Sequence, residues 1–229
     1  MDISLYYEER GAGFPLVLLH GNGESHEYFA RQMEPFSRAF RVLAPDTRGH
    51  GRSPRGEGAF TLRRFADDLY DFLRARGIER AHILGFSDGG NLAIKFALQW
   101  PQMVEKLILN GANVEMFLGV KPQVQLPIYA GYGVASLFSR ISRKAARKRD
   151  VLGLMVHPYG VRMDDLARLE MPTLIIVGEH DMIKDRQTRE MAAHIPHCRV
   201  EVFRDGDHFV AAKQPSRFNR TVMEFILGR

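Results

Sequence analysis

The chain has 229 residues, of which 45% are hydrophobic and 26% are charged, and this composition describes a soluble globular protein of one domain, with room for an insertion. The single cysteine, Cys198, excludes an internal disulfide, and the N-terminus is acidic where a secretory signal would be basic. Both features favour a cytoplasmic location. The uncharged stretch 122–139 contains two glutamines, two prolines and two glycines, which argues against a membrane-spanning helix.

Most of the formal net charge of +5 comes from one segment. Residues 140–149, RISRKAARKR, contain six of the 32 basic residues and no acid, which leaves 26 basic against 27 acidic residues elsewhere. The basic residues that fall on one helical face are Arg140, Arg143, Lys144, Arg147 and Lys148. Such a face is commonly only solvated, and this one lacks the interleaved aromatic residues of a nucleic-acid site. We expect no nucleic-acid partner and no stable membrane insertion; the alternative to a solvated face is a weak contact with anionic substrates or an anionic membrane surface.

Short apolar runs alternate with segments in which apolar residues recur every three to four positions. The predicted strands are an edge strand near 3–10, then 15–20, 40–46, 81–86, 105–111, 172–178 and 198–203. The predicted helices are 28–40, 62–76, 89–99 and 188–194. This alternation predicts an α/β fold, a doubly wound and mainly parallel sheet with both faces buried. Ligands of such sheets collect beyond the carboxyl ends of the strands.

The segment ILGFSDGGN, residues 83–91, places a serine between a predicted strand and a predicted helix with no room for a loop. The bend forces a strained backbone on Ser87, which is tolerable only if the residues two before and two after it lack side chains. Gly85 and Gly89 meet this demand. The start of the helix places the N–H of Asp88 beside any oxyanion that forms. An ordinary strand-to-helix turn is the alternative that this stretch alone leaves open.

A serine hydroxyl is a poor nucleophile at neutral pH, so a nucleophilic role requires a histidine base and an acid that orients it. Asp181 and His208 each follow a predicted strand, and the chain order Ser87, Asp181, His208 is that of one hydrolase architecture. Asp185 and Asp207 are the competing acids. Asp185 lies too far into the following helix, and Asp207 is adjacent to the histidine in sequence, so we favour Asp181.

Two upstream segments fit the same pattern. HGNG, residues 20–23, ends a central strand, and its glycines let the backbone fold back so that the N–H of Asn22 becomes a second oxyanion donor. DTRGHGRS, residues 46–53, is a turn-rich loop in which we expect His50 to be structural. With Gly85-x-Ser87-x-Gly89, Gly178-x-x-Asp181 and Gly206-x-His208, the sequence resembles the α/β-hydrolase family over nearly the whole chain.

The resemblance implies an α/β-hydrolase fold with a short helical lid inserted after the sixth strand. Residues 1–111 and 170–229 then form the hydrolase core, and residues 112–169 form the lid. The resemblance further implies Ser87 as the nucleophile, His208 as base and then acid, and Asp181 as the orienting carboxylate. It assigns the oxyanion hole to the backbone amides of Asn22 and Asp88.

The lid segment offers apolar and aromatic side chains to a pocket over Ser87, and the predicted pocket residues are Met116, Phe117, Ile128, Tyr129 and Tyr132. Such a pocket predicts a modest, partly apolar substrate; alternatively, these residues only pack the lid onto the core. We expect no metal and no nucleotide cofactor, because the sequence has no closely spaced Cys/His set, P-loop or dinucleotide fingerprint.

These features together predict a carboxylesterase-like serine hydrolase that cleaves a small ester through an acyl-enzyme. The serine at 87 disfavours carbon–halogen and epoxide chemistry, for which family members place an aspartate there. Thioesters, lactones, activated amides and vinylogous 1,5-diketones cleaved at a carbon–carbon bond are alternatives for the same three residues. GFSDGG followed by NLAI resembles the branch with carbon–carbon bond hydrolases and amino-acyl ester hydrolases. A receptor that keeps the three residues but turns over slowly is an alternative of another class.

Overall fold

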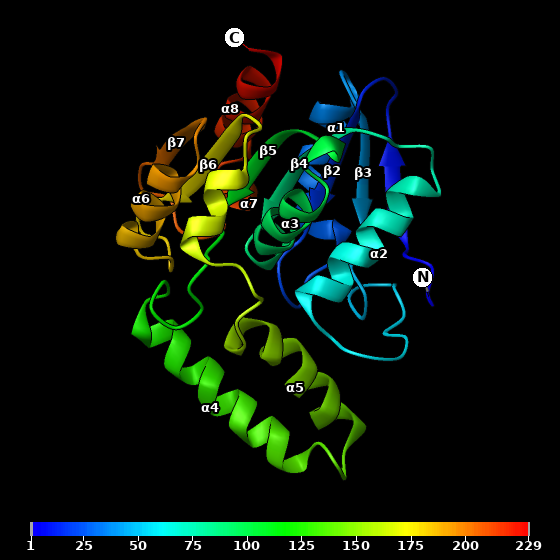
Figure 1. Ribbon diagram of the computed structural model, residues 1–229, viewed down its shortest axis with the longest axis vertical. Coiled ribbons are helices and arrows are strands. Elements are labelled where there is room, and N and C mark those ends of the chain that lie inside the picture. Colours follow the sequence, from blue (N-terminus) through cyan, green and yellow to red (C-terminus); the bar gives the residue numbers. More distant parts are fainter. Residues whose placement is uncertain (1, 229) are drawn as a thin grey trace.

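The computed structural model describes residues 2–228, and its seven strands form one sheet in the order β1-β3-β2-β4-β5-β6-β7 (Figure 1). The strands are β1 (Tyr7–Arg10), β2 (Pro15–Leu19), β3 (Arg41–Pro45), β4 (Ala81–Phe86), β5 (Val104–Asn110), β6 (Thr173–Gly178) and β7 (Cys198–Phe203). β1 pairs antiparallel with β3 at one edge, and the other neighbours pair parallel. The predicted mainly parallel α/β sheet is therefore confirmed.

The helices connect and cover these strands. They are α1 (Ala30–Ser37), α2 (Leu62–Arg74), α3 (Asp88–Gln99), α4 (Pro122–Phe138), α5 (Arg143–Val156), α6 (Asp185–His194), α7 (Val210–Lys213) and α8 (Pro215–Leu227), with 3-10 helices η1 (His26–Phe29), η2 (Pro101–Met103) and η3 (Met163–Arg168). Side-chain caps mark two of the starts: the hydroxyl of Thr61 accepts from the N–H of Arg64 before α2, and Ser142 accepts from Ala145 before α5. Each of the four predicted helical segments overlaps a helix, although α6 begins three residues before the predicted segment 188–194.

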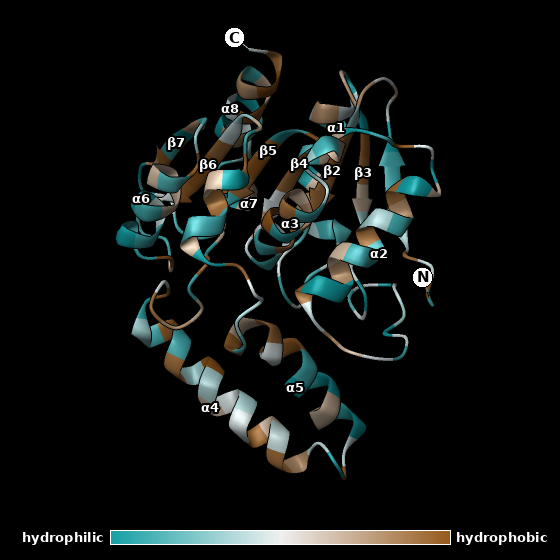
Figure 2. Ribbon diagram, in the orientation of Figure 1, coloured by the Kyte–Doolittle hydropathy of each residue, from teal (hydrophilic) through white to brown (hydrophobic). Residues whose placement is uncertain are grey.

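The sheet separates two hydrophobic cores. Val17 and Leu19 point into the core formed with α2, α3 and α6, whereas Leu16 and Leu18 point into the core formed with α1, α7 and α8. This alternation follows from the two-residue repeat of a strand, and it explains why the central strands contain unbroken apolar runs such as 16–19 in β2 (Figure 2). β7 is different, because Val200 and Val202 are exposed at the free edge of the sheet. The prediction that 198–203 is a buried strand is wrong for this reason.

The hairpin of α4 and α5 lies beyond the carboxyl ends of the parallel strands (Figure 1). It follows β5, the fifth strand of the described sheet, so the predicted insertion after a sixth strand is wrong in number. In the part of the chain that the structure describes, the antiparallel edge strand β1 and four parallel strands precede the hairpin. The hairpin touches the sheet domain through polar contacts: the amide of Asn22 donates to the carbonyl of Val151 (2.7 Å), and Arg55 pairs with Asp150 (2.8 Å). No helix within residues 2–228 has both the length and the apolar composition needed to cross a membrane.

Candidate active site

Ser87 alone connects a strand to a helix, because β4 ends at Phe86 and α3 begins at Asp88. Its backbone has φ +53 and ψ −121, a conformation that residues other than glycine rarely adopt. The flanking glycines permit this bend: a Cβ on Gly85 would lie 2.3 Å from the carbonyl oxygen of Gly89, and a Cβ on Gly89 would lie 2.1 Å from that of Leu19. Only glycine fits at either position, and the serine hydroxyl is left above the end of the strand.

Ser87, His208 and Asp181 form one hydrogen-bonded chain. The Oγ of Ser87 lies 3.0 Å from Nε2 of His208, and Nδ1 of the same ring lies 2.7 Å from Oδ1 of Asp181. Asp181 follows β6 and His208 follows β7, and both side chains are buried. With Nδ1–H donating to the carboxylate, Nε2 is free to accept the hydroxyl proton. The arrangement is that of a nucleophile, a base and an orienting acid.

The two acids that competed with Asp181 for the imidazole, Asp207 and Asp185, do not contact it: Asp207 has other partners, and Asp185 lies at the start of a helix. Oδ1 of Asp207 accepts from the N–H of Phe209 at 2.9 Å, and its Oδ2 pairs with Lys213. Asp185 is the first residue of α6. The carboxylate on the His208 ring is therefore that of Asp181, which is also held by the N–H of Ile183 at 3.0 Å.

Two residues that sequence reasoning did not single out pack against the imidazole. Gly111 directly follows β5 with φ +62, and a Cβ there would lie 2.7 Å from Cε1 and 2.8 Å from Nδ1 of His208. The ring of Phe86 lies 4.9 Å from the imidazole centroid. The sequence signal for Gly111 is its place at the carboxyl end of a central strand, where the site was expected.

The loop that follows β2 is fixed by its first histidine. Nε2 of His20 accepts from the N–H of Thr47 at 3.0 Å, and Nδ1 donates to the carbonyl oxygen of Gly21 at 2.7 Å. Burial lowers the pKa of His20 to about 4, so the ring is neutral at physiological pH. The side-chain oxygen of Asn22 lies 3.2 Å from Nε2 of His50, which accordingly has the structural position predicted for it. The loop is thus anchored at His20 and through the side chain of Asn22.

Two carboxyl groups near the imidazole have raised pKa values. Burial raises the pKa of Asp88 to about 6, partly offset by the amide of Asn91, which donates to Oδ1 at 3.1 Å. Burial also raises the pKa of Glu24 to about 7, opposed by the N–H of Gly21, which donates to Oε2 at 3.1 Å. Among the described residues, no partner bonds Oδ2 of Asp88 with normal hydrogen-bond geometry, although the nearby side chain of Asn22 lowers the pKa of this carboxyl. The sequence shows that Asp88 directly follows the serine and that Glu24 directly follows HGNG, but it does not reveal that both side chains are buried.

Residues 15–150 match the sequence model of the alpha/beta hydrolase fold family. The chain belongs to this family. The 2-hydroxymuconate semialdehyde hydrolase of Pseudomonas putida is 29% identical to it, covering 95% of this chain and 89% of that protein. Among solved structures, the meta-cleavage product hydrolase CumD of Pseudomonas fluorescens has a TM-score of 0.81 at 25% identity, covering 99% of this chain and 95% of that one. Est816, described as an N-acyl homoserine lactone degrading enzyme, has a TM-score of 0.82 at 26% identity and covers 97% of each chain.

In this α/β-hydrolase family member, the five predicted pocket residues lie in or just before α4. Met116 is buried, Phe117 is exposed, and the three others, Ile128, Tyr129 and Tyr132, are half-buried. The rings of Phe117 and Tyr129 meet edge to face at 5.6 Å between centroids. Both tyrosine hydroxyls form hydrogen bonds near the end of α5. That of Tyr129 donates to the backbone oxygen of Val156 at 3.2 Å, and that of Tyr132 lies 2.8 Å from the ring of His157. These hydroxyls hold α4 against α5.

A cavity of about 10 Å³ lies between the loop after β2, Asp88 and Leu154 of α5. Its volume is that of a single water-sized sphere. None of the five predicted pocket residues belongs to its lining. The space beside Asp88 is therefore closed by α5 rather than by the residues of α4.

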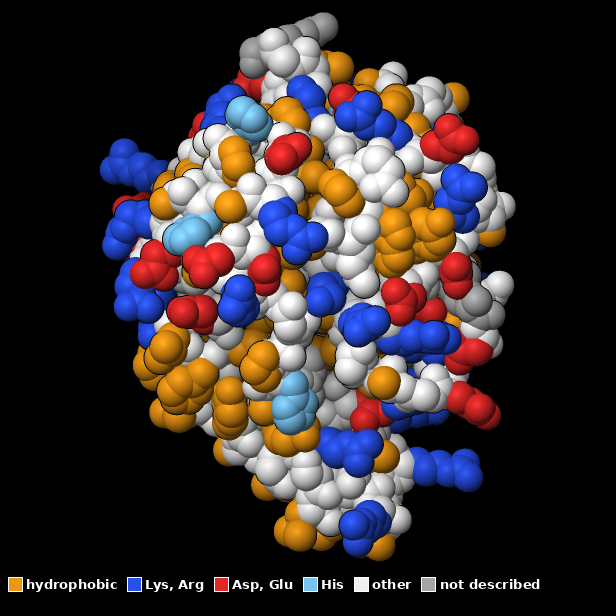
Figure 3. Space-filling view, viewed as in Figure 1, with side chains coloured by type: hydrophobic (Ala, Val, Ile, Leu, Met, Phe, Trp, Pro, Cys, Tyr) orange, Lys and Arg blue, Asp and Glu red, His pale blue; other side chains and the backbone are white. Residues whose placement is uncertain are grey.

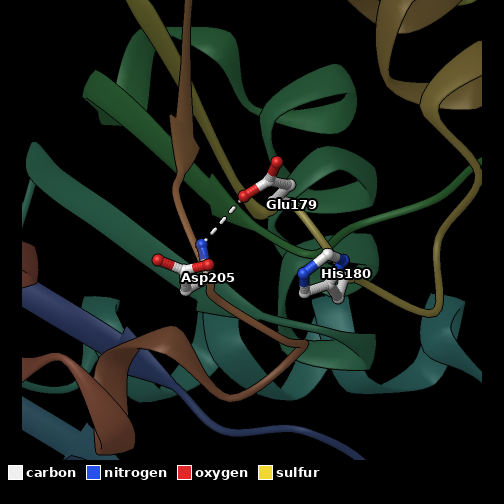
Figure 4. Close-up of side chains that lie close together, drawn as sticks. All are labelled: Glu179, His180 and Asp205. Carbon is white, nitrogen blue, oxygen red and sulfur yellow. Dashed lines mark hydrogen bonds between the residues drawn. The ribbon is translucent and has the colours of Figure 1, made fainter.

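Glu179, His180 and Asp205 form the one group of possible metal ligands found among residues 2–228, with ligand atoms within 4.8 Å of one another (Figure 4). All three side chains are exposed. Oε2 of Glu179 already accepts the N–H of Asp205 at 2.9 Å, which joins the loops after β6 and β7 (Figure 4). Exposed acidic groups are common without a bound ion, so we interpret this cluster as a contact that holds the two loops together.

Proposed function

We propose that this family member is a serine hydrolase that cleaves a carboxylic ester of a small, partly apolar substrate through an acyl-enzyme. Ser87 is the nucleophile, His208 the base and Asp181 the orienting acid. The observation that carries this proposal is the hydrogen-bonded chain through the three side chains, with distances of 3.0 and 2.7 Å. The strained backbone of Ser87 supports it, because strain of this kind clusters at functional sites.

In the proposed reaction, Oγ of Ser87 attacks the carbonyl carbon while its proton passes to Nε2 of His208. The carboxylate of Asp181 stabilises the imidazolium that forms. Collapse of the tetrahedral intermediate breaks the ester C–O bond, and the leaving alcohol takes the proton from Nε2. Water then attacks the acyl-enzyme with His208 again as base, which releases the carboxylic acid and restores the serine.

The proposed oxyanion donors are the backbone N–H groups of Asn22 and Asp88. Asp88 is the first residue of α3, so its N–H has no partner within the helix and points out of a positive helix end. The anchoring of the loop after β2 through His20 and Thr47 supports a fixed position for Asn22. Fixed donors of this kind stabilise a developing oxyanion without reorganising during the reaction.

We further propose that residues 112–169 act as a lid over a core formed by 1–111 and 170–229, with substrate contacts from Met116, Phe117, Ile128, Tyr129 and Tyr132. The bond between Asn22 and Val151 supports this arrangement, because it joins α5 to the proposed oxyanion loop. The exposed Phe117, in ring contact with Tyr129, offers an apolar surface at one end of α4.

Hydrolysis of a carbon–carbon bond in a vinylogous diketone is the second candidate reaction. Two of the similar proteins carry names of this kind, the 2-hydroxymuconate semialdehyde hydrolase and the meta-cleavage product hydrolase. The same serine, histidine and acid serve both reactions, so the substrate decides between them. Turnover of p-nitrophenyl esters of varied chain length, measured beside turnover of a vinylogous diketone, separates the two.

A fluorophosphonate probe and two matched variants test the proposed triad. We expect the probe to label the wild-type protein and not Ser87→Ala, and Asp181→Asn to lower ester kcat by about 10⁴-fold, because the imidazole loses its orienting partner. Asp207→Asn is the matched control and leaves kcat within a few-fold, with folding of all variants checked by circular dichroism. Near-normal turnover by Asp181→Asn would refute the assignment. Labelling of Ser87 with no turnover of either substrate class would favour the slow binding receptor instead.

A further inference from the structure

The turn between α4 and α5 lies at the end of the molecule farthest from the sheet (Figure 1). It exposes large apolar side chains. Leu137 is 76% exposed, Phe138 is 47% exposed and Ile141 is 81% exposed. A single exposed apolar residue is ordinary on a soluble protein. Three within five positions at a protruding turn form a patch of the kind that marks an interaction site. We call Leu137, Phe138 and Ile141 the apolar tip.

Basic side chains follow the apolar tip in the turn and in α5. The exposed ones in the following segment are Arg140, Arg143, Lys144, Arg147 and Lys148. None of these five has an ion-pair partner among residues 2–228, whereas the neighbouring Arg149 pairs with Asp150 at 2.8 Å. Blue and orange side chains accordingly lie side by side over the lower end of the molecule in Figure 3. The positive charge of this end is not neutralised by the protein itself.

An open groove of about 420 Å³ runs between α4 and α5 behind the apolar tip. Its lining includes the apolar side chains of Val134, Ala135 and Phe138, and the cationic side chains of Lys144 and Lys148. An apolar floor with cationic groups at its border is complementary to an acyl chain that carries an anionic head group. The groove and the apolar tip therefore point to the same kind of partner.

We propose that the α4–α5 hairpin docks on an anionic lipid bilayer, with the apolar tip in the acyl boundary and Lys144 and Lys148 at the head groups. A second copy of this chain is a poorer partner, because two identical basic tips repel each other. A nucleic acid neutralises the charge but leaves the apolar tip in water. The bilayer surface satisfies both features at once, and the hairpin lies on it without crossing it.

The expected strength of docking follows from the number of free cations. Each lysine or arginine near an anionic bilayer surface raises the partition coefficient about fivefold. Removing the charges of Lys144 and Lys148 therefore lowers partitioning about 25-fold, since the two effects multiply. The attraction is electrostatic over a Debye length of about 10 Å at 0.1 M salt, so high salt weakens it as well.

Vesicle co-sedimentation of the full chain tests this proposal. We expect binding to vesicles of phosphatidylcholine with phosphatidylglycerol and no binding to phosphatidylcholine alone. Lys144→Gln with Lys148→Gln lowers binding about 25-fold, and Leu137→Ser with Ile141→Ser lowers it at least tenfold at unchanged charge. The matched control is Arg38→Gln with Arg80→Gln, which removes two exposed charges far from the hairpin and leaves binding within twofold. All six substituted side chains are largely exposed, so the variants fold.

Three outcomes would overturn docking on lipid. The first is a lack of binding to the phosphatidylglycerol vesicles, and the second is an equal loss in the control variant. The third is a dimer in sedimentation velocity that Leu137→Ser with Ile141→Ser dissociates, with no change in vesicle binding, since the tip would then be a contact between copies. Turnover of a water-soluble ester by the tip variants equals that of the wild type. This second readout separates failure of the docking proposal from failure of the hydrolase proposal.

Discussion

Gly111 limits the space around the imidazole of His208. A Cβ at this position would lie 2.7 Å from Cε1 of the ring and 3.5 Å from Oδ2 of Asp181, closer to the ring than a real contact allows. We expect Gly111→Ala to push the ring away from Ser87 and to lower kcat by at least 100-fold. A displacement of about 1 Å in a catalytic group is enough for such a loss. Ester turnover measured beside the urea unfolding midpoint tests this expectation.

Gly77 supplies the control for that substitution. Its φ of +66 is close to the +62 of Gly111, but no heavy atom lies within 4 Å of where its Cβ would be. Gly77→Ala therefore carries the same backbone strain of about 1 kcal/mol, without a clash. Both variants should lose stability through this strain, Gly111→Ala more because of its clash, while only Gly111→Ala loses turnover. Equal turnover in the two variants would show that the imidazole has room to adjust.

At the same scale, the serine, histidine and acid were predictable because each follows a strand in a parallel sheet. The carboxyl ends of such strands meet at one edge, so the positions of Ser87, Asp181 and His208 after three separate strands predicted that they lie close together. The contacts of Gly111 and Glu24 were not predictable in this way. They depend on backbone positions and on burial across long sequence separations, which no local pattern contains.

At the scale of elements, the loop after β3 is joined to α2 by a buried ion pair. The guanidinium of Arg48 is fully buried and makes two bonds to the carboxylate of Asp68, at 2.6 and 2.7 Å. Arg48→Ala leaves the buried Asp68 with only the more distant Arg64, at 3.7 Å, and also removes the pair with Asp2, so we expect a loss of about 3 to 5 kcal/mol in the free energy of unfolding. Urea unfolding measures it, with an unchanged m-value as the sign that both states keep their compactness.

Arg52, four residues further along the same loop, provides the comparison. Its exposed side chain lies over the ring of Tyr6 at 3.8 Å, a contact worth about 0.5 to 1 kcal/mol. Arg52→Ala should therefore cost much less than Arg48→Ala. A similar loss in both variants would mean that the pair with Asp68 contributes no more than a surface contact.

How well each helix or strand could be predicted depends on the strength of its sequence pattern. The strands β4 and β7 begin and end at the predicted residues, because apolar runs bounded by turn residues are strong signals. The helix α8 was not predicted, although Pro215 at its start and the spacing of Phe218, Val222 and Ile226 are helical signals. The exposure of β7 depends on its place at the sheet edge. The sequence of a single strand does not reveal the order of the strands in the sheet.

At the scale of the whole molecule, a run of unpaired basic residues lies on the hairpin, and two buried carboxyl groups lie near the imidazole. Those of Glu24 and Asp88 have pKa values of about 7 and about 6, both raised by burial. The basic segment was visible in the sequence because it is contiguous. The acidic pair was not, because its members are 64 positions apart and become neighbours of one imidazole only in the fold.

The buried Asp88 makes the stability of the whole chain depend on pH. Its pKa rises from 3.8 to about 6 on folding, because burial disfavours the charged form. The folded state therefore binds more protons than the unfolded state between these two values, and stability falls as pH rises from about 4 to about 6. Well above pH 6 the loss is complete, about 3 kcal/mol, at about 1.4 kcal/mol for each pH unit between the two values. We expect Asp88→Asn to be more stable than the wild type by this amount at pH 8 and equal to it at pH 4, in urea unfolding at each pH.

Asp164→Asn is the control for this prediction. The side chain of Asp164 is 81% exposed, so the stability of this variant should follow that of the wild type at every pH. A less stable Asp88→Asn at pH 8 would contradict this account, since it would mean that the ionised carboxylate stabilises the fold.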